Sequence, residues 1–364
     1  RPGKLLKGGA LRRPKWPCGQ DRKKANGLPS PPTIPAPLMK PEEYLDTLSF
    51  SEKLYRNDPE TATRLLPPHV IEFLRDGVTI IPQAISLDLL DRLDEELARL
   101  SDLSKAPAIY GDIGIDGKDE HYKARHLRNL AIHDFRREPP GLKLVDLHRY
   151  FDSAREIAFS KPITDFLEGL FGSPAGLIQS LTFWKSSEQP VHQDFSYVHH
   201  HSRIAQLAAA WIPLEDIDAD AGPLVYYKGS HRPDELGFFD WGDGSILASR
   251  DAASQTFERY THHLENIISS QGLEASIFLP RRGDLLIWHG ALIHGGTPMR
   301  NPALTRKSFV THYTSATSHA YMQRFRIGEG YGFFEPPVAQ QLHHPSLARR
   351  IVGRAKRSLA RFLE

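Results

Sequence analysis

The feature of this sequence that most restricts its fold is a change of texture at Leu177. From this residue onward, short apolar runs are bounded by turn-forming residues, which is typical of a β-rich domain. The predicted strands are Leu177–Lys185, Ile204–Pro213, Leu224–Tyr227, Asp284–His289 and Lys307–Tyr313. Between the third and the fourth of them, residues 232–276 are polar and contain several aromatic residues. A connection of that length in a compact domain is commonly a lid or an insertion.

The chain before Leu177 is predicted to contain more helix than strand. In residues 69–77 apolar side chains recur at helical spacing, and Gly77 stands where such a helix would end. Ser86 is a candidate N-cap for an amphipathic helix that continues to Leu100. The other predictions for this part are a strand over Val78–Ile81, a helix over Tyr150–Gly172 and an irregular connection over residues 103–140.

The composition indicates a soluble globular protein. Of its 364 residues, 40% are hydrophobic and 25% are charged, which is ordinary for this class. Lys and Arg total 46 against 44 Asp and Glu, so a net charge of +2 does not indicate a general electrostatic grip on nucleic acid. The single cysteine, Cys18, excludes an internal disulfide framework and fits a reducing compartment, so we expect a cytoplasmic location. No apolar run approaches the roughly 18–20 residues of a membrane span, so no integral membrane segment is expected.

Both ends of the sequence differ from its middle. Residues 1–40 are basic and rich in proline, and they are predicted to form a flexible tail. Residues 41–330 are predicted to form the main domain, with a helical part at 41–175 and a β core at 176–315. Residues 331–364 are predicted to be a C-terminal extension with a basic amphipathic helix, which packs on its own domain or lies on an anionic membrane or another protein.

Two histidines are followed two residues later by an acidic side chain, in His192-Gln193-Asp194 and in His263-Leu264-Glu265. With 18 His and 44 acidic residues in the chain, chance alone produces about two such pairs. The context favours the first pair, because it follows a predicted strand and residues i and i+2 of a strand point to the same face. The second pair lies in a stretch of helical character, where such residues diverge around the helix axis.

A third histidine would complete a candidate metal site around the first pair, and an arginine would supply a fixed cation beyond it. The candidates for the third ligand are His231, His289 and His294, and their pattern alone does not separate them. Two His and one carboxylate on one side of a metal, with open positions opposite, suit non-haem Fe(II) that must bind oxygen and a co-substrate. A guanidinium offers two parallel donors to a carboxylate, so an arginine is expected to bind a carboxylate of the co-substrate. The candidates for this arginine are Arg306 and its rivals Arg282 and Arg300.

The sequence from Phe73 to Tyr313, about two thirds of the chain, resembles the phytanoyl-CoA dioxygenase family. The motifs that carry the resemblance are Phe73-Leu74-Arg75-Asp76-Gly77-Val78, His192-Gln193-Asp194 with Tyr197, Asp220-Ala221-Gly222-Pro223-Leu224, Gly229-Ser230-His231, Gly283-Asp284, Ile293-His294-Gly295-Gly296, and Arg306 before His312-Tyr313. The resemblance implies an α+β fold with a mainly β core. That core would be a double-stranded β-helix (a jelly roll, or cupin-like barrel) with flanking N-terminal helices.

The same resemblance implies roles for individual residues. By match to the family motifs, His192, Asp194 and His294 would be the ligands of Fe(II). The residues implied to bind the co-substrate 2-oxoglutarate are Arg306, which would hold its distal carboxylate, Thr297, which would assist Arg306, and Gln179.

The function that the resemblance implies is a dioxygenase that uses O2 and 2-oxoglutarate to hydroxylate an unactivated C–H bond of a small molecule, with release of succinate and CO2. The acid at Asp194 favours hydroxylation, because related halogenating enzymes have a small residue there. The alternative is a non-catalytic jelly-roll protein that binds a small molecule.

Overall fold

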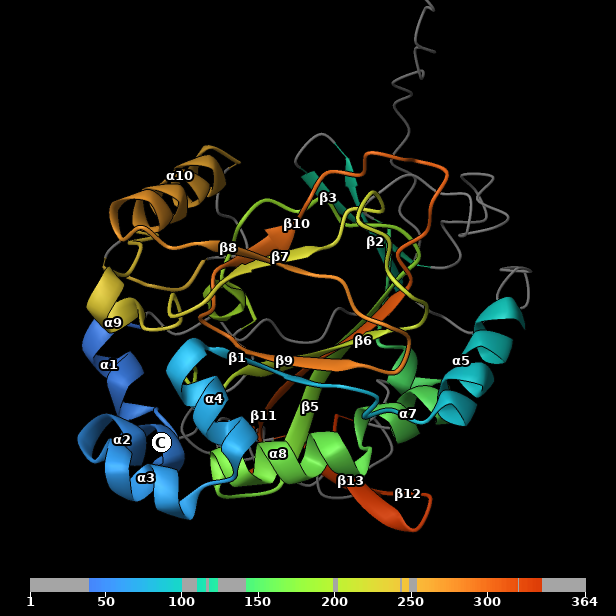
Figure 1. Cartoon of the computed structure of the whole chain (residues 1–364), viewed down its shortest axis with the longest axis horizontal. Coiled ribbons are helices and arrows are strands. Elements are labelled where there is room, and N and C mark those ends of the chain that lie inside the picture. Colours follow the sequence, from blue (N-terminus) through green and yellow to red (C-terminus); the bar gives the residue numbers. More distant parts are fainter. Residues whose placement is uncertain are drawn as a thin grey trace, which may run out of the picture. The chain divides into compact units, whose positions relative to one another are not determined.

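The structure is a computed structural model that describes residues 39–99, 110–115, 118–123, 142–198, 202–242, 244–248, 254–319 and 321–335 (Figure 1). The predicted basic tail up to residue 38 and the predicted C-terminal helix beyond residue 335 lie outside these residues. The helices are α1 (Pro41–Asp46), α2 (Phe50–Asn57), α3 (Pro59–Leu65), α4 (Pro68–Asp76), α5 (Leu87–Arg99), α7 (Asp152–Ala158), α8 (Lys161–Phe171), α9 (Pro233–Leu236) and α10 (Ser254–Ser270). The strands are β1 (Val78–Ile81), β2 (Tyr110–Ile115), β3 (Lys118–Lys123), β4 (Lys143–Val145), β5 (Ala175–Phe183), β6 (Ala208–Pro213), β7 (Leu224–Tyr227), β8 (Ala275–Phe278), β9 (Leu285–His289), β10 (His294–Gly296), β11 (Ser308–Ser315), β12 (Gln323–Ile327) and β13 (Gly330–Phe334).

The strands form two sheets of unequal size. The large sheet has ten strands, of which eight follow the order β1-β9-β6-β11-β5-β4-β2-β3, while β13 pairs with both β5 and β12. Neighbouring strands are antiparallel except where β13 pairs with β5. The small sheet has the antiparallel order β10-β7-β8. The chain is therefore a mixed α/β protein built on a large antiparallel sheet.

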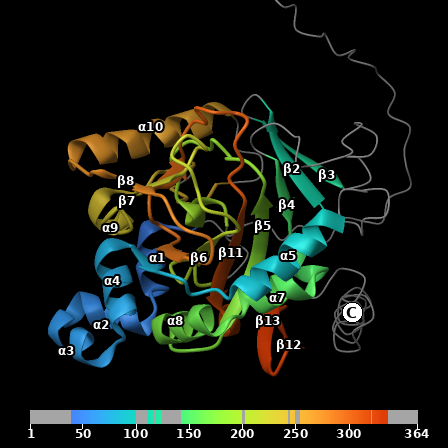
Figure 2. The ribbon, with the colours of Figure 1, turned by 45° about the vertical axis from the view of Figure 1, so that its right-hand side comes forward.

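The large sheet is buried on both faces. Helices α4, α5, α7 and α8 cover one face, and the small sheet lies over the other (Figures 1 and 2). Along β6 and β9, Ile212 and Ile287 pack toward the helices, whereas Trp211 and Trp288 pack toward the small sheet. Strands that are buried on both faces appear as continuous apolar runs in a sequence. For this reason β6 and β9 stand out without a polar alternation.

The predicted strands are all present: Val78–Ile81 and Leu224–Tyr227 have the predicted ends, and the other four differ at one end or both. Two other predictions need correction. The single helix predicted over Tyr150–Gly172 is two helices, α7 and α8. Pro162 lies in the first turn of α8, and its missing N–H prevents one helix from continuing through it. The irregular connection predicted over residues 103–140 contains a hairpin, formed by β2 and β3.

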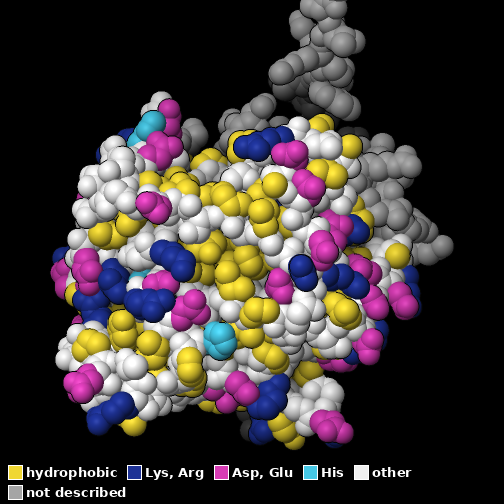
Figure 3. Space-filling model, viewed as in Figure 1, with side chains coloured by type: hydrophobic (Ala, Val, Ile, Leu, Met, Phe, Trp, Pro, Cys, Tyr) yellow, Lys and Arg dark blue, Asp and Glu magenta, His cyan; other side chains and the backbone are white. Residues whose placement is uncertain are grey.

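The surface carries mixed charge on the face drawn in Figure 3, where lysines and arginines are interspersed with aspartates and glutamates. Among the described residues, no helix combines the length and the apolar composition that a membrane crossing requires.

We expect Gly77→Ala to destabilise the fold more than Gly229→Ala, although both glycines have left-handed backbones with φ of +80° and +81°. A Cβ at Gly77 would lie 2.6 Å from Nδ1 of His231, whereas nothing lies within 4 Å of one at Gly229. Urea denaturation should therefore give about 1 kcal/mol of loss for Gly229→Ala, from backbone conformation alone. Gly77→Ala should lose a further 1–3 kcal/mol or so through overpacking. Equal losses would show that the contact with His231 relaxes freely.

Candidate metal centre

His192, Asp194 and His294 converge on one point between the two sheets. One ligand atom from each residue lies within 4.8 Å of the others, and no other group of three such residues does so in the part of the chain that the structure describes. Oδ1 of Asp194 is 3.6 Å from Nε2 of His192 and 3.7 Å from Nε2 of His294. The three atoms thus surround a position that suits a metal ion.

The backbone around His192 and Asp194 is not the regular strand geometry from which their shared face was inferred. His192 pairs with His294 in an isolated antiparallel bridge, in which each backbone N–H donates to the other residue's carbonyl, at 2.9 and 3.0 Å. Asp194 begins a 3-10 turn that ends at Ser196. The bridge therefore brings together residues that are 102 positions apart, and the turn swings Asp194 toward both imidazoles.

Backbone carbonyls fix the tautomer of both imidazoles. Nδ1 of His192 lies 2.8 Å from the carbonyl oxygen of Pro190, and Nδ1 of His294 lies 2.9 Å from that of Leu292. A carbonyl only accepts, so each Nδ1 must carry the hydrogen and donate. Each Nε2 is then left with a lone pair that faces the shared point, which is the arrangement that a metal-binding histidine requires.

Protonation in this cluster also suits a metal. Burial, together with the neighbouring His294, lowers the pKa of His192 to about 3. Burial by itself would raise the pKa of Asp194, but His294, His312 and His192 outweigh it and hold that pKa below its usual range. At neutral pH the site therefore offers neutral imidazole and an ionised carboxylate, the forms that bind metals.

Two N–H groups that were not predicted from the sequence hold the far oxygen of Asp194. Oδ2 accepts from Nε1 of Trp288, at 2.8 Å, and from Nε2 of His312, at 3.2 Å. Trp288 comes from β9 and His312 from β11, on the face of the large sheet that points to the small sheet. Oδ1 alone faces the two imidazoles.

Arg306, two residues before β11, is a buried cation. Only 3% of its surface is exposed, and its guanidinium carbon lies 5.5 Å from the ring centre of Trp211 and 5.7 Å from that of Phe183. Its Nε has no hydrogen-bond partner, and among the described residues no carboxylate forms an ion pair with it. Burial lowers its pKa to about 10. The geometry leaves this guanidinium in need of an anion.

The two rival arginines are placed differently. Arg300 has a side chain that is 79% exposed, near Asp220. Arg282 forms ion pairs with Asp91, at 2.7 Å, and Asp94, at 2.9 Å. Neither is a buried cation that lacks a carboxylate partner.

Gln179 contacts a residue that holds Asp194, whereas the hydroxyl of Thr297 is engaged with a backbone carbonyl. Gln179 is opposite His312 in the pairing of β5 with β11, and its amide nitrogen is 3.3 Å from Nδ1 of His312. Thr297 directly follows β10, and its hydroxyl donates to the carbonyl of Pro223 at 2.9 Å.

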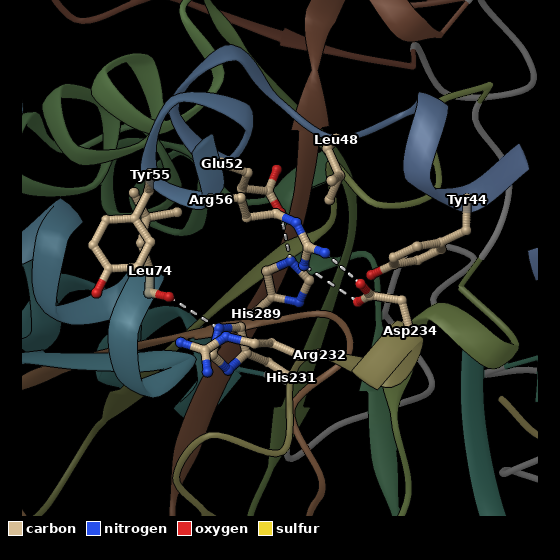
Figure 4. Close-up of a pocket in the computed structure, with 10 residues that line it drawn as sticks. All are labelled: Tyr44, Leu48, Glu52, Tyr55, Arg56, Leu74, His231, Arg232, Asp234 and His289. Atoms are coloured by element: carbon tan, nitrogen blue, oxygen red, sulfur yellow. Dashed lines mark hydrogen bonds and ion pairs between the residues drawn. The ribbon is translucent and has the colours of Figure 1, made fainter. Parts of the chain in front are cut away.

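The two rival histidines lie together at another place, around a cavity of about 30 Å³ (Figure 4). Nε2 of His289 is 3.0 Å from Oε1 of Glu52 in α2, and its Nδ1 accepts from the backbone of Ala291. Nε2 of His231 is 3.1 Å from the carbonyl of Leu74. Both histidines therefore help to dock the N-terminal helices against the end of β9. The rejected pair, His263 and Glu265, lies in helix α10, as the sequence predicts.

The predicted insertion braces the loop that carries His192 and Asp194. The hydroxyl oxygen of Tyr260, in α10, accepts from the backbone N–H of Gln193 at 3.0 Å and lies 2.9 Å from the hydroxyl of Ser196. Tyr260 is 2% exposed, and burial raises its pKa above the usual range of a tyrosine. No spacing signal in the sequence connects Tyr260 with this loop.

We expect Tyr260→Phe to weaken both the fold and metal binding. The change leaves the N–H of Gln193 buried without a partner, which should reduce the free energy of unfolding by about 1–3 kcal/mol. Tyr313→Phe is the matched control, because it removes a buried hydrogen bond to Ala158 on the helix-covered face of the sheet. Urea denaturation should show a loss for both variants, and Co(II) titration should show weaker binding for Tyr260→Phe alone. Equal Co(II) affinities would mean that the brace does not position the loop.

Comparison with known proteins supports the resemblance seen in the motifs. The family model described as phytanoyl-CoA dioxygenase (PhyH) matches residues 73–308. No curated protein sequence matches the chain. Among solved structures, the non-haem α-ketoglutarate-dependent epimerase SnoN from nogalamycin biosynthesis is 18% identical, with a TM-score of 0.48, over 71% of this chain and 85% of that one. EctD from S. alaskensis in its apo form is 17% identical (TM-score 0.45, covering 68% and 76%), and AviO1 from Streptomyces viridochromogenes Tue57 is 16% identical (TM-score 0.43, covering 69% and 95%).

Proposed function

This chain belongs to the phytanoyl-CoA dioxygenase family of 2-oxoglutarate-dependent non-haem iron enzymes, and from this premise we propose that it hydroxylates an unactivated C–H bond of a small molecule. Succinate and CO2 would be the products of 2-oxoglutarate. The observation that carries the proposal is the convergence of His192, Asp194 and His294, whose ligand atoms lie within 4.8 Å of one another. We also propose a cytoplasmic location for the reaction.

We propose His192, Asp194 and His294 as the ligands of Fe(II). Two neutral imidazoles and one carboxylate from the protein leave positions open for a co-substrate and oxygen. When bound, the iron and 2-oxoglutarate together supply the oxidising chemistry that activates O2. The residues of this chain orient the metal: the bridge between His192 and His294 sets the distance between the imidazoles, and the carbonyls of Pro190 and Leu292 direct their lone pairs.

We propose that Arg306 binds the distal carboxylate of 2-oxoglutarate. A buried guanidinium without a carboxylate partner is costly by itself, and a bidentate anion would satisfy it. Trp211 and Phe183 hold the guanidinium between their rings and exclude water from it. Thr297 and Gln179 are proposed as additional contacts to the same co-substrate.

We infer that the two sheets are the halves of a double-stranded β-helix. Trp211 and Trp288 of the large sheet pack with Leu224, Tyr226 and Phe278 of the small sheet, so the two sheets enclose one apolar interior. The proposed ligands come from both sides of that interior, since His294 belongs to β10 and Asp194 is held by residues of β9 and β11. A substrate would approach at the mouth of this interior.

Succinate formation tests the proposal. The purified protein, given Fe(II), 2-oxoglutarate and O2, is screened against a metabolite library for substrate-stimulated release of succinate. We expect His192→Ala to abolish that release. The matched control is His263→Ala, which removes the histidine of the rejected pair and should leave the rate unchanged. Absence of iron binding and of succinate with every pool would favour the alternative, a jelly-roll protein that binds a small molecule without catalysis.

A further inference from the structure

We infer that Trp288 and His312 are positioning residues that make Asp194 bind the metal through Oδ1 alone. The inference rests on the proposed function, because it concerns the same metal. It adds two residues, neither of them a proposed ligand, whose task is to decide how many coordination positions the carboxylate occupies.

The geometry at Oδ2 carries the inference. A carboxylate oxygen has two lone pairs in its plane, and Oδ2 meets two N–H donors, from Trp288 at 2.8 Å and from His312 at 3.2 Å. Both donors come from strands of the large sheet rather than from the loop that carries Asp194. Oδ2 is thus fixed from outside the loop, and its lone pairs are already used.

The tautomer of His312 is set from its other side. The amide nitrogen of Gln179 lies 3.3 Å from Nδ1 of His312, and an amide NH2 group only donates. Nδ1 must therefore accept, so the ring hydrogen is on Nε2, where it points to Asp194. Gln179 of β5 therefore donates to His312 of β11, and His312 donates to Asp194 in the loop that carries the proposed ligands.

Burial makes these two donors decisive. Trp288, His312 and Asp194 are each 3% exposed, so water does not replace a donor that is removed. A buried oxygen that loses a partner pays the full desolvation penalty or finds another partner. If Oδ2 of Asp194 loses one of its donors, the metal bound at Oδ1 is the nearest alternative partner. Binding through both oxygens would consume a coordination position that the co-substrate or oxygen needs.

Co(II) binding tests the inference without turnover. Trp288→Phe and His312→Leu each remove one donor, and each should raise the Kd for Co(II) by about 10–100-fold, as is usual when an outer partner of a ligand is lost. Each should also change the visible absorption spectrum of bound Co(II), because the coordination number changes. His312→Gln keeps an N–H near the position of Nε2, so its Kd should stay within about threefold of the original.

The control is Trp241→Phe, which removes a buried indole N–H that has no hydrogen-bond partner among the described residues. It should leave both the Kd and the spectrum unchanged. If the unchanged protein binds no Co(II), the proposed function fails. If it binds Co(II) and both donor-deleted variants bind it with the same Kd and the same spectrum, the inference alone fails.

A crystal structure of the unchanged protein with Co(II) gives a result that needs no variant to fold. We expect the metal to contact Oδ1 of Asp194, with Oδ2 still held by Trp288 and His312. Contact of the metal with both oxygens would overturn the inference.

Discussion

Replacing Arg306 with methionine should weaken the binding of 2-oxoglutarate by roughly 100-fold while making the metal-free protein more stable. Methionine fills a similar volume between Trp211 and Phe183 but carries no charge. Losing one partner of a buried, hydrogen-bonded charge pair costs about 3 kcal/mol of binding free energy, which corresponds to that change in Kd. Isothermal titration with 2-oxoglutarate in the presence of Co(II) measures it.

The gain in stability distinguishes a co-substrate site from a structural cation. Without 2-oxoglutarate, the guanidinium is buried with no carboxylate partner among the described residues, and burial already lowers its pKa to about 10. Substituting an apolar side chain for such a charge should raise the free energy of unfolding, on the order of 1–4 kcal/mol. Arg300→Met is the control, because that side chain is 79% exposed and should change neither quantity. A variant at Arg306 that is less stable and still binds 2-oxoglutarate would contradict the assignment.

The strands that could be predicted are those whose burial leaves a mark on the sequence. β6 and β9 are buried along their whole length and appear as continuous apolar runs. β10 carries no such mark, because His294-Gly295-Gly296 has no apolar side chain. Its conformation comes from its pairing with β7, and its glycines allow close neighbours: a Cβ at Gly295 would lie 3.0 Å from the carbonyl oxygen of Gln189. Such pairing depends on the tertiary structure, so the local sequence does not predict β10.

The candidate ligands were predictable only in part from the residues themselves. Spacing selected His192 and Asp194 but left His231, His289 and His294 as equals, and the family motif made the choice. The structure shows a physical difference among the three. The backbone of His294 pairs with that of His192, whereas His289 is engaged with Glu52 and His231 with the carbonyl of Leu74. Such engagements depend on how helices α2 and α4 dock, which no local pattern contains.

The roles of Trp288 and His312 could not be predicted from the sequence. Strand alternation places Arg306 and His312 on one face, since they are six positions apart, and it places Leu286 and Trp288 on one face of β9. Alternation does not say which face of either strand meets Asp194. The face that meets Asp194 is decided by the order of the large sheet. In this order β6 lies between β9 and β11, and Trp288 of β9 and Val310 of β11 lie on the face toward the small sheet.

Replacing Asp194 with asparagine should abolish metal binding while the protein stays folded. An amide has one acceptor oxygen and one NH2 group, which only donates. Trp288 and His312 both donate at the position of Oδ2, so the amide oxygen should settle there and leave NH2 at the position of Oδ1. That position is 3.6 and 3.7 Å from Nε2 of His192 and His294, so NH2 would point at their lone pairs and block the metal.

The expected rise in the Kd for Co(II) exceeds about 100-fold, the upper end of what the loss of an outer partner causes. Asparagine keeps the volume of the buried side chain and both of the hydrogen bonds at Oδ2, so thermal unfolding should be nearly unchanged. Glu265→Gln makes the same acid-to-amide change in the rejected pair and should not affect Co(II) binding. If Asp194→Asn bound Co(II) as tightly as the unchanged protein, the amide would have to present its oxygen to the metal. In that case the two donors would not control the orientation of this side chain.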